Sequence, residues 1–135
     1  MLPYEKPLPP IDDLSRPFWE AARREELCLP RCRACGHITT QFERWCPRCA
    51  GKDLDWVKMS GRGTVWSHVA FHRMYFKAFE DDLPYNVALV ELEEGPRLIT
   101  NLIDIARESI EIGLPVTAAF IAVTPEVTLV KFRPR

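Results

Sequence analysis

Short runs of hydrophobic and β-branched residues, separated by turns, dominate the second half of the chain. The runs cover residues 64–71, 85–91, 97–103, 116–123 and 128–132, and turns rich in glycine and proline separate the later ones. Residues 72–84 are long enough to form a loop between the first two runs. Five short strands of this kind predict a small β-barrel, and the OB-type barrel is the architecture that we expect.

The N-terminal part of the chain shows a helical pattern instead. Its apolar residues at helical spacing are Leu14, Phe18, Trp19 and Ala22. Ser15 suits the N-cap, Pro17 is acceptable in the first turn, and the helix is expected to end near Glu26. The apolar face needs a partner surface. The protein's own core is one candidate, and another subunit that contacts Phe18 and Trp19 is the other.

Between these parts lie four cysteines in two pairs, Cys32-x-x-Cys35 and Cys46-x-x-Cys49. Each Cys-x-x-Cys turn directs two thiolates at one point, and two such turns complete the tetrahedral sulfur shell that Zn²⁺ accepts. Because four sulfurs leave no open position on the metal, the pattern indicates a structural zinc site and not a catalytic one. Residues 27–29 and 55–59 are the expected strands of this zinc ribbon.

The remaining cysteine and the histidines give no catalytic signal. Cys28 has no flanking base, so we interpret it as a small apolar residue on the first ribbon strand. His37 is expected on the ribbon surface, since four sulfurs suffice for zinc. His68 and His72 would share a strand face, but no nearby group would orient either imidazole. We therefore assign no catalytic residue.

Composition and charge narrow the class of protein. The chain is 47% hydrophobic and 27% charged, which is ordinary for a soluble globular protein. The longest apolar stretch, 114–123, is too short to span a bilayer, and a cytoplasmic location is expected. In that reducing compartment paired cysteines favour metal over disulfides. Residues 61–135 carry a slight acidic excess, which argues against binding a nucleic-acid backbone.

These patterns predict a mainly β protein with an N-terminal helix, in three units. Residues 1–26 form an extension and helix, 27–60 the zinc ribbon and 61–135 an OB-fold domain, with a glycine-rich hinge at 60–63. The acidic residues Glu91, Glu93 and Glu94 flank a turn, where we expect them to be solvated.

The order of motifs resembles the DUF35 family, which joins a rubredoxin-like zinc ribbon to an OB-fold and is associated with acyl-CoA. The matching features cover nearly the whole chain. They are Pro17-Phe18-Trp19, the cysteine pairs, Gly61-Arg62-Gly63-Thr64-Val65, Pro84-Tyr85, Val90-Glu91-Leu92, Glu94-Gly95, Ile112-Gly113 and Phe132-Arg133-Pro134.

The resemblance implies an accessory subunit and not a free-standing enzyme. Such proteins are partnered with thiolase-like enzymes, thiolase-related aldolases or hydratases that act on CoA thioesters, in a hetero-oligomer whose partner supplies the catalytic groups. The small subunit would complete the acyl-CoA binding site and stabilise the complex, and the CoA thioester would be a shared ligand.

Residue evidence for that ligand is limited to one cationic and aromatic set. Arg62 at the barrel entrance, with Arg73, Lys77 and Phe79 in the long loop, offers positive charge and apolar surface for the phosphates, pantetheine and adenine of CoA. A solvated loop with a local hydrophobic anchor, or a protein interface, would use the same residues.

Two other classes of function stay open. A nucleic-acid-binding module is one, because zinc ribbons and OB-folds occur in such proteins and Trp66, Phe71 and Tyr85 could stack on bases. A free-standing hydratase or thioesterase is the other, but it needs an acid–base pair in a pocket that the sequence does not reveal.

Overall fold

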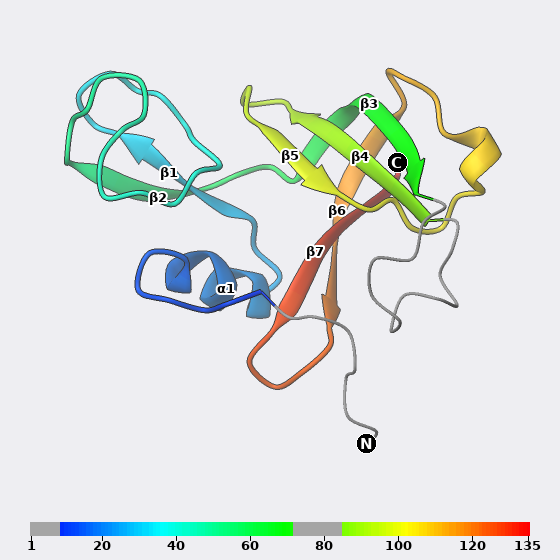
Figure 1. The fold of residues 1–135 in the computed structure, drawn as a ribbon, viewed down its shortest axis with the longest axis horizontal. Helices are drawn as coiled ribbons and strands as arrows, with labels where there is room; N and C mark the ends of the chain where they lie inside the picture. The colour runs from blue at the N-terminus through cyan, green and yellow to red at the C-terminus, as the bar shows by residue number, and fades with distance from the viewer. Residues whose placement is uncertain (1–8, 72–84) are drawn as a thin grey trace.

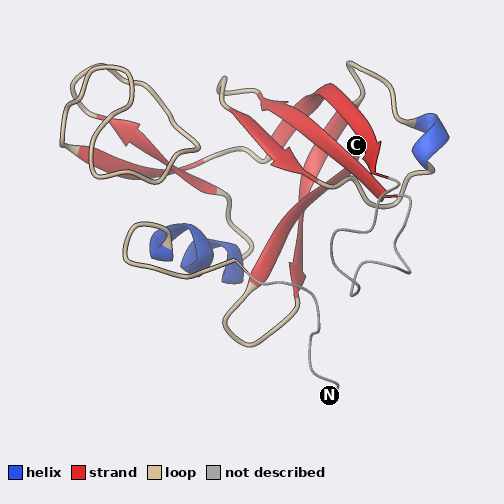
Figure 2. Cartoon of the chain, viewed as in Figure 1, coloured by secondary structure: helices blue, strands red, loops and turns tan. Residues whose placement is uncertain are grey.

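The computed structural model describes residues 9–71 and 85–135, which form one α-helix, a two-stranded sheet and a five-stranded sheet. The two sheets lie towards opposite ends of the long axis, and the helix lies below the two-stranded sheet, beside the lower ends of β6 and β7 (Figures 1 and 2). The expected mainly β fold with an N-terminal helix is confirmed. Within the described ranges, no helix has the length and apolar character needed to cross a membrane.

Helix α1 (Arg16–Arg23) is shorter than expected. Ser15 stands at the N-cap, but its hydroxyl makes no capping bond to the helix. It accepts a hydrogen bond from the Asp12 N–H at 3.2 Å, while the Ser15 N–H donates to the Asp12 carboxylate at 2.8 Å. The helix ends before Glu26 because Glu25 adopts a left-handed conformation with φ 59°. The reciprocal pair therefore fixes the turn that leads into α1.

Two antiparallel strands form the ribbon, β1 (Cys28–Cys32) and β2 (Leu54–Lys58). They match the two expected ribbon strands. Residues 33–53 form turns and irregular structure, apart from a single bridge between Arg31 and Ile38. We call residues 33–53 the knuckle loop, because it contains most of both cysteine turns. One side of it faces the turn between β4 and β5 of the five-stranded sheet (Figure 1).

All neighbouring strands of the larger sheet are antiparallel, in the order β5-β4-β3-β6-β7. They are β3 (Arg62–Phe71), β4 (Tyr85–Leu92), β5 (Arg97–Thr100), β6 (Pro115–Ala122) and β7 (Thr128–Pro134). A short 3₁₀ helix, η2 (Arg107–Ser109), lies between β5 and β6. Each strand falls on one of the five predicted runs.

The two edges of this sheet approach each other. Leu102, just beyond β5, forms a parallel bridge with Phe132 of β7, and the Ile103 N–H donates to the Phe132 carbonyl at 2.8 Å. The Thr100 hydroxyl donates to the Val130 carbonyl at 3.2 Å. Strand β5 stops short of residue 103 because the chain here leaves β4 and turns to β7. The sheet is thus a curled half-barrel, as the OB-type prediction requires.

One hydrophobic cluster joins the half-barrel to the base of the ribbon. Its fully buried members from the half-barrel include Val65, Val90, Val116 and Phe132. Leu29 of β1 and Met59 after β2 belong to the same cluster. The ribbon strands are therefore anchored in the core of the larger sheet.

Hydrogen bonds to the turn between β4 and β5 fix residues 60–63, which link the ribbon to the half-barrel. The Ser60 N–H donates to the Glu94 carboxylate at 2.7 Å, and Arg62 Nε donates to Glu93 Oε1 at 3.0 Å. A Cβ at Gly63 would lie 2.5 Å from the carbonyl oxygen of Glu91, so β3 can approach β4 this closely only with glycine there.

The three acids near this turn are at least partly exposed, as expected, but they also make specific bonds that the sequence did not predict. Glu93 and Glu94 tie down the linker, and Glu91 accepts a hydrogen bond from Arg97 Nε at 3.1 Å. Their partners come from β3, β5 and the linker, which the local sequence pattern could not bring together.

Candidate metal centre and adjoining cleft

The two Cys-x-x-Cys turns have the same backbone geometry. The Gly36 N–H donates to the Cys32 carbonyl, and the Ala50 N–H donates to the Cys46 carbonyl, both at 2.8 Å. The residue after each second cysteine is left-handed, with φ 79° at Gly36 and 62° at Ala50. Glycine adopts this conformation without steric cost, whereas alanine is strained. The second turn is therefore held in shape by its surroundings.

These turns bring all four sulfurs together. The Cys32 and Cys49 sulfurs are 3.6 Å apart, as are those of Cys35 and Cys46, and the four lie within 4.8 Å of one another. A tetrahedral Zn²⁺ with bonds of about 2.3 Å places its sulfurs about 3.8 Å apart. The cluster is compatible with one structural zinc ion.

Four sulfurs at this spacing cannot all ionise without a compensating cation. Burial raises the pKa of Cys46, but hydrogen bonds from the N–H groups of Cys49 and Arg48 outweigh it and lower that pKa to about 7. The Gly51 N–H lowers the pKa of Cys49, but the neighbouring cysteine sulfurs outweigh it and raise that pKa to about 12. A divalent cation would resolve this conflict by holding all four as thiolates.

Cys28 and the histidines stand apart from this cluster. Cys28 is buried at the first position of β1 and is not among the four clustered sulfurs. Burial raises the pKa of its thiol, which disfavours the nucleophilic thiolate. His37 accepts a hydrogen bond from the Cys32 N–H through its carbonyl, and its side chain lines a neighbouring cleft. His68 lies half-buried in β3, and His72 lies outside the described residues.

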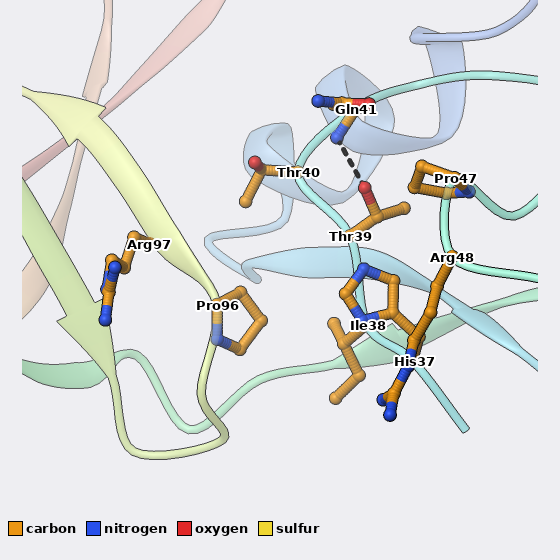
Figure 3. Close-up of a pocket in the computed structure, with 9 residues that line it drawn as sticks. All are labelled: His37, Ile38, Thr39, Thr40, Gln41, Pro47, Arg48, Pro96 and Arg97. Carbon is orange, nitrogen blue, oxygen red and sulfur yellow. Dashed lines mark hydrogen bonds between the residues drawn. The ribbon is translucent and has the colours of Figure 1, made fainter. Parts of the chain in front are cut away.

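An open cleft of about 320 Å³ separates the knuckle loop from the turn between β4 and β5 (Figure 3). The lining residues are His37, Ile38, Thr39, Thr40, Gln41, Pro47, Arg48, Pro96 and Arg97. In Figure 3 His37 and Arg48 lie together on the ribbon side, and the Arg97 guanidinium lies apart from them on the sheet side. The sequence did not reveal this cleft, because its two walls are far apart along the chain.

Of the residues predicted to contact CoA, Arg62 is the one that the structure describes. It opens β3 and is ion-paired with Glu93, whose carboxylate also lies 3.7 Å from the guanidinium of Arg135. The hydrogen bond to Glu93 raises the pKa of Arg62. Arg73, Lys77 and Phe79 lie outside the described residues. The grouping of these four residues therefore stays a prediction.

The predicted interface residues on α1 belong to an aromatic cluster. The rings of Phe18 and Trp19 meet edge to face at 4.9 Å, Phe18 lies 5.2 Å from Phe42, and Phe42 lies 5.4 Å from Trp56. Both helix residues are half-buried. Phe18 packs against the hydrophobic core, so part of the apolar face has its partner within the chain.

The chain has a helix, a four-cysteine ribbon and an OB-type half-barrel, in this order. This order of elements is typical of proteins that join a rubredoxin-like ribbon to an OB-fold. The family model described as the C-terminal OB-fold domain of ChsH2 matches residues 56–120. A DUF35 domain-containing scaffold protein of Methanocaldococcus jannaschii is 36% identical over 100 residues, which are 72% of this chain and 70% of that protein. The chain belongs to the DUF35 family.

Two further relatives cover almost the whole chain. A protein of Thermomonospora curvata named probable enoyl-CoA hydratase alpha subunit is 43% identical over 96% of this chain, which spans only 40% of that relative's length. A solved structure titled Ltp2-ChsH2(DUF35) aldolase is similar with a TM-score of 0.83 and 42% identity. That match covers 94% of this chain and 98% of the solved one.

Proposed function

We propose that this chain is a non-catalytic accessory subunit of an enzyme that acts on CoA thioesters. The observation that carries the proposal is the similarity to the DUF35 chain of an aldolase, which extends over nearly all of both chains. In that title the DUF35 component stands beside a second component, Ltp2. A thiolase-related aldolase or thiolase-like subunit is therefore the partner that we place first.

A hydratase partner is the alternative, and a specific observation favours it. The relative from Thermomonospora curvata carries the name of an enoyl-CoA hydratase subunit and matches at 43% identity. This chain spans less than half of that relative, and we propose that the catalytic groups lie outside the part that matches. In either case the partner supplies the nucleophile and the acid–base groups.

Within the complex, the four cysteines would hold a zinc ion with a scaffolding role. Cys32, Cys35, Cys46 and Cys49 are the residues that would bind it. Bound zinc supplies cross-links and charge neutralisation, which a loop with little apolar core requires in order to fold. We further propose that residues 1–26, 27–60 and 61–135 act as helix, ribbon and OB units of one scaffold in the cytoplasm.

The proposal also includes direct contact between this chain and acyl-CoA. Arg62, Arg73, Lys77 and Phe79 remain its candidate residues, and Phe18 and Trp19 remain candidates for the partner interface. Arginine-to-alanine and lysine-to-alanine changes at 62, 73 and 77 should raise the KM for acyl-CoA of the complex without preventing assembly. Glu93→Gln is the control for Arg62, because it removes the same ion pair but keeps the cation. Unchanged kinetics in all three variants would remove these residues from the ligand site.

The role as a subunit is tested by affinity purification of the tagged chain from its native host in moderate salt, followed by mass spectrometry. We expect an aldolase-, thiolase- or hydratase-type subunit in near-equal amount. The purified partner should then turn over acyl-CoA only when this chain is added back. Recovery of nucleic acid that is lost as salt rises would contradict the proposal and support a nucleic-acid-binding module.

A further inference from the structure

The sheet formed by β3, β4 and β5 is apolar on both faces. In β4, Ala88 and Val90 point into the core and are buried, so the alternating residues Val87 and Leu89 point outwards. Strand register places Ile99 of β5 directly opposite Leu89. A strand that is apolar on both faces is typical of a sheet that is covered on both sides.

We call the outward surface of these three strands the outer face. It is defined by Trp66, Val69, Val87, Leu89 and Ile99. Trp66 is 47% exposed, Val69 54% and Ile99 79%, and the grouping of such side chains on one face is more informative than the exposure of any one of them. Helix α1 covers a different part of the molecule, because it packs against β1, β6 and β7. In Figure 1 it lies beside the lower ends of β6 and β7, away from β4 and β5.

The two charged side chains on this surface, Arg97 and Glu91, neutralise each other. Arg97 Nε donates to Glu91 at 3.1 Å, and the two residues are register partners across β4 and β5. The Arg97 guanidinium carbon also lies 3.8 Å from the centroid of the Trp66 ring. The outer face therefore presents aliphatic side chains beside a tryptophan already stacked on arginine, with the charges at one end paired.

We propose that the outer face is the docking surface for the enzyme subunit of the complex, which meets it with an apolar, uncharged surface. This inference rests on the proposed function. The same unit is part of a longer polypeptide in the hydratase relative but accounts for almost a whole chain in the aldolase structure. Where the unit is almost a whole chain, as in the aldolase structure, it must hold its enzyme through a surface of its own.

Charge and side-chain chemistry both favour this occupant over nucleic acid. OB-folds that bind oligonucleotides use the face around their second and third strands, with cationic grooves and stacked aromatic rings. Here those strands are β4 and β5, and their outward residues are mainly aliphatic. The binding energy of a protein interface is concentrated in a few hot-spot residues, commonly tryptophan and arginine. Trp66 and Arg97 provide such a pair beside Leu89 and Ile99.

The test compares two tryptophans that are exposed to nearly the same extent. Trp66 lies on the outer face at 47% exposure, and Trp45 lies in the knuckle loop at 49%. The probe is the enzyme subunit identified with the wild-type chain, expressed separately and titrated against each variant. Trp66→Ala and Ile99→Asp should weaken its binding at least about 30-fold, whereas Trp45→Ala and the conservative Ile99→Val should bind like wild type. Zinc content and circular dichroism check that each variant is folded.

Each outcome separates the inference from the function on which it rests. If the wild-type chain binds tightly and Trp66→Ala and Ile99→Asp bind equally tightly, the outer face is not the docking surface, although the subunit role stands. If the wild-type chain retains no aldolase, thiolase or hydratase subunit, the proposed function is wrong and the inference falls with it. A wild-type homodimer that Ile99→Asp converts to monomer in light scattering would assign the outer face to a second copy, and single-stranded RNA binding lost in Trp66→Ala would assign it to nucleic acid. Either result overturns the inference.

Discussion

The knuckle loop and the half-barrel are stabilised in different ways. In the half-barrel, Val65, Val90, Val116 and Phe132 are almost completely buried in one cluster. The buried residues of the knuckle loop are Thr39 and Cys46, and only Ile38 and Phe42 of this loop pack, partly buried, against the cluster. A loop with so little apolar core needs a cross-link, and the four sulfurs are positioned to provide one through zinc. The comparison predicts different responses to substitution in the two regions.

The largest effect is expected from removal of a predicted metal ligand. Cys46→Ser should abolish zinc binding, leave residues 33–53 unfolded and make the protein insoluble, because structural zinc contributes about 10–16 kcal/mol in small ribbons. The soluble yield of the variant and the zinc content of its soluble fraction measure this. Cys28→Ser is the control, since Cys28 is buried but lies outside the cluster. A folded, zinc-free Cys46→Ser chain that still supports its partner would refute the scaffold role.

The half-barrel should respond most to loss of its largest buried side chain. Phe132 is fully buried and forms part of the seam between β7 and the chain after β5, so Phe132→Ala should cost about 3–5 kcal/mol of unfolding free energy. Denaturant titration of the zinc-loaded protein measures this. Phe120→Ala is the matched control, because Phe120 is only partly buried on neighbouring β6. Equal losses for the two variants would mean that the seam does not stabilise the half-barrel.

A smaller effect is expected where β3 approaches β4 most closely. Gly63→Ala places a methyl group 2.5 Å from the Glu91 carbonyl oxygen and 2.8 Å from a Val90 methyl. Relief requires the strands to separate, at a cost of about 1–3 kcal/mol. The melting temperature of the zinc-loaded chain should therefore fall, whereas Thr64→Ala at the neighbouring outward position should change it little. Wild-type stability in Gly63→Ala would show that the strands adjust freely.

In the knuckle loop, one substitution should stabilise the protein. Ala50 has the left-handed φ of 62° that Gly36 has in the first turn, and a Cβ in this conformation costs roughly 1–2 kcal/mol. Ala50→Gly relieves that strain but raises the conformational entropy of the unfolded chain. We therefore expect the free energy of unfolding to rise by up to about 1 kcal/mol. Zinc affinity measured by competition with a chelator reports this gain. Weaker zinc binding than in wild type would contradict it.

The smallest effect concerns the linker that joins the two regions. The Arg62 hydrogen bond lowers the pKa of Glu93 from its ordinary value of 4.5. A carboxyl with a lowered folded pKa stabilises the fold above its unfolded pKa, and this contribution is lost as pH falls through the folded value. Thermal unfolding measured below pH 4.5 should therefore lose a small, salt-sensitive increment in wild type that Glu93→Gln lacks. Parallel pH profiles of the two proteins would show that the ion pair adds no stability.

The cysteine spacing and the strand runs were sufficient to predict the metal cluster and the fold class. Two Cys-x-x-Cys turns can close on one point because their geometry is local, and five β-rich runs separated by glycine and proline specify short strands. The structure confirmed these elements and shifted their ends, for example where Glu25 terminates α1 and where β5 leaves β4 after Thr100. Such ends depend on single backbone conformations and tertiary hydrogen bonds, which sequence periodicity does not encode.

The contacts between distant segments were decided by the tertiary structure alone. Glu93 and Glu94 hold the linker, Arg97 covers Trp66, and Ile99 joins Leu89 on an exposed apolar surface, because the curled sheet brings β3, β4 and β5 side by side. The sequence by itself determined that four cysteines have zinc-binding spacing and which runs of residues form strands. Which outward side chains form one continuous face depends on strand register and curvature, and these are set by pairing between segments far apart along the chain.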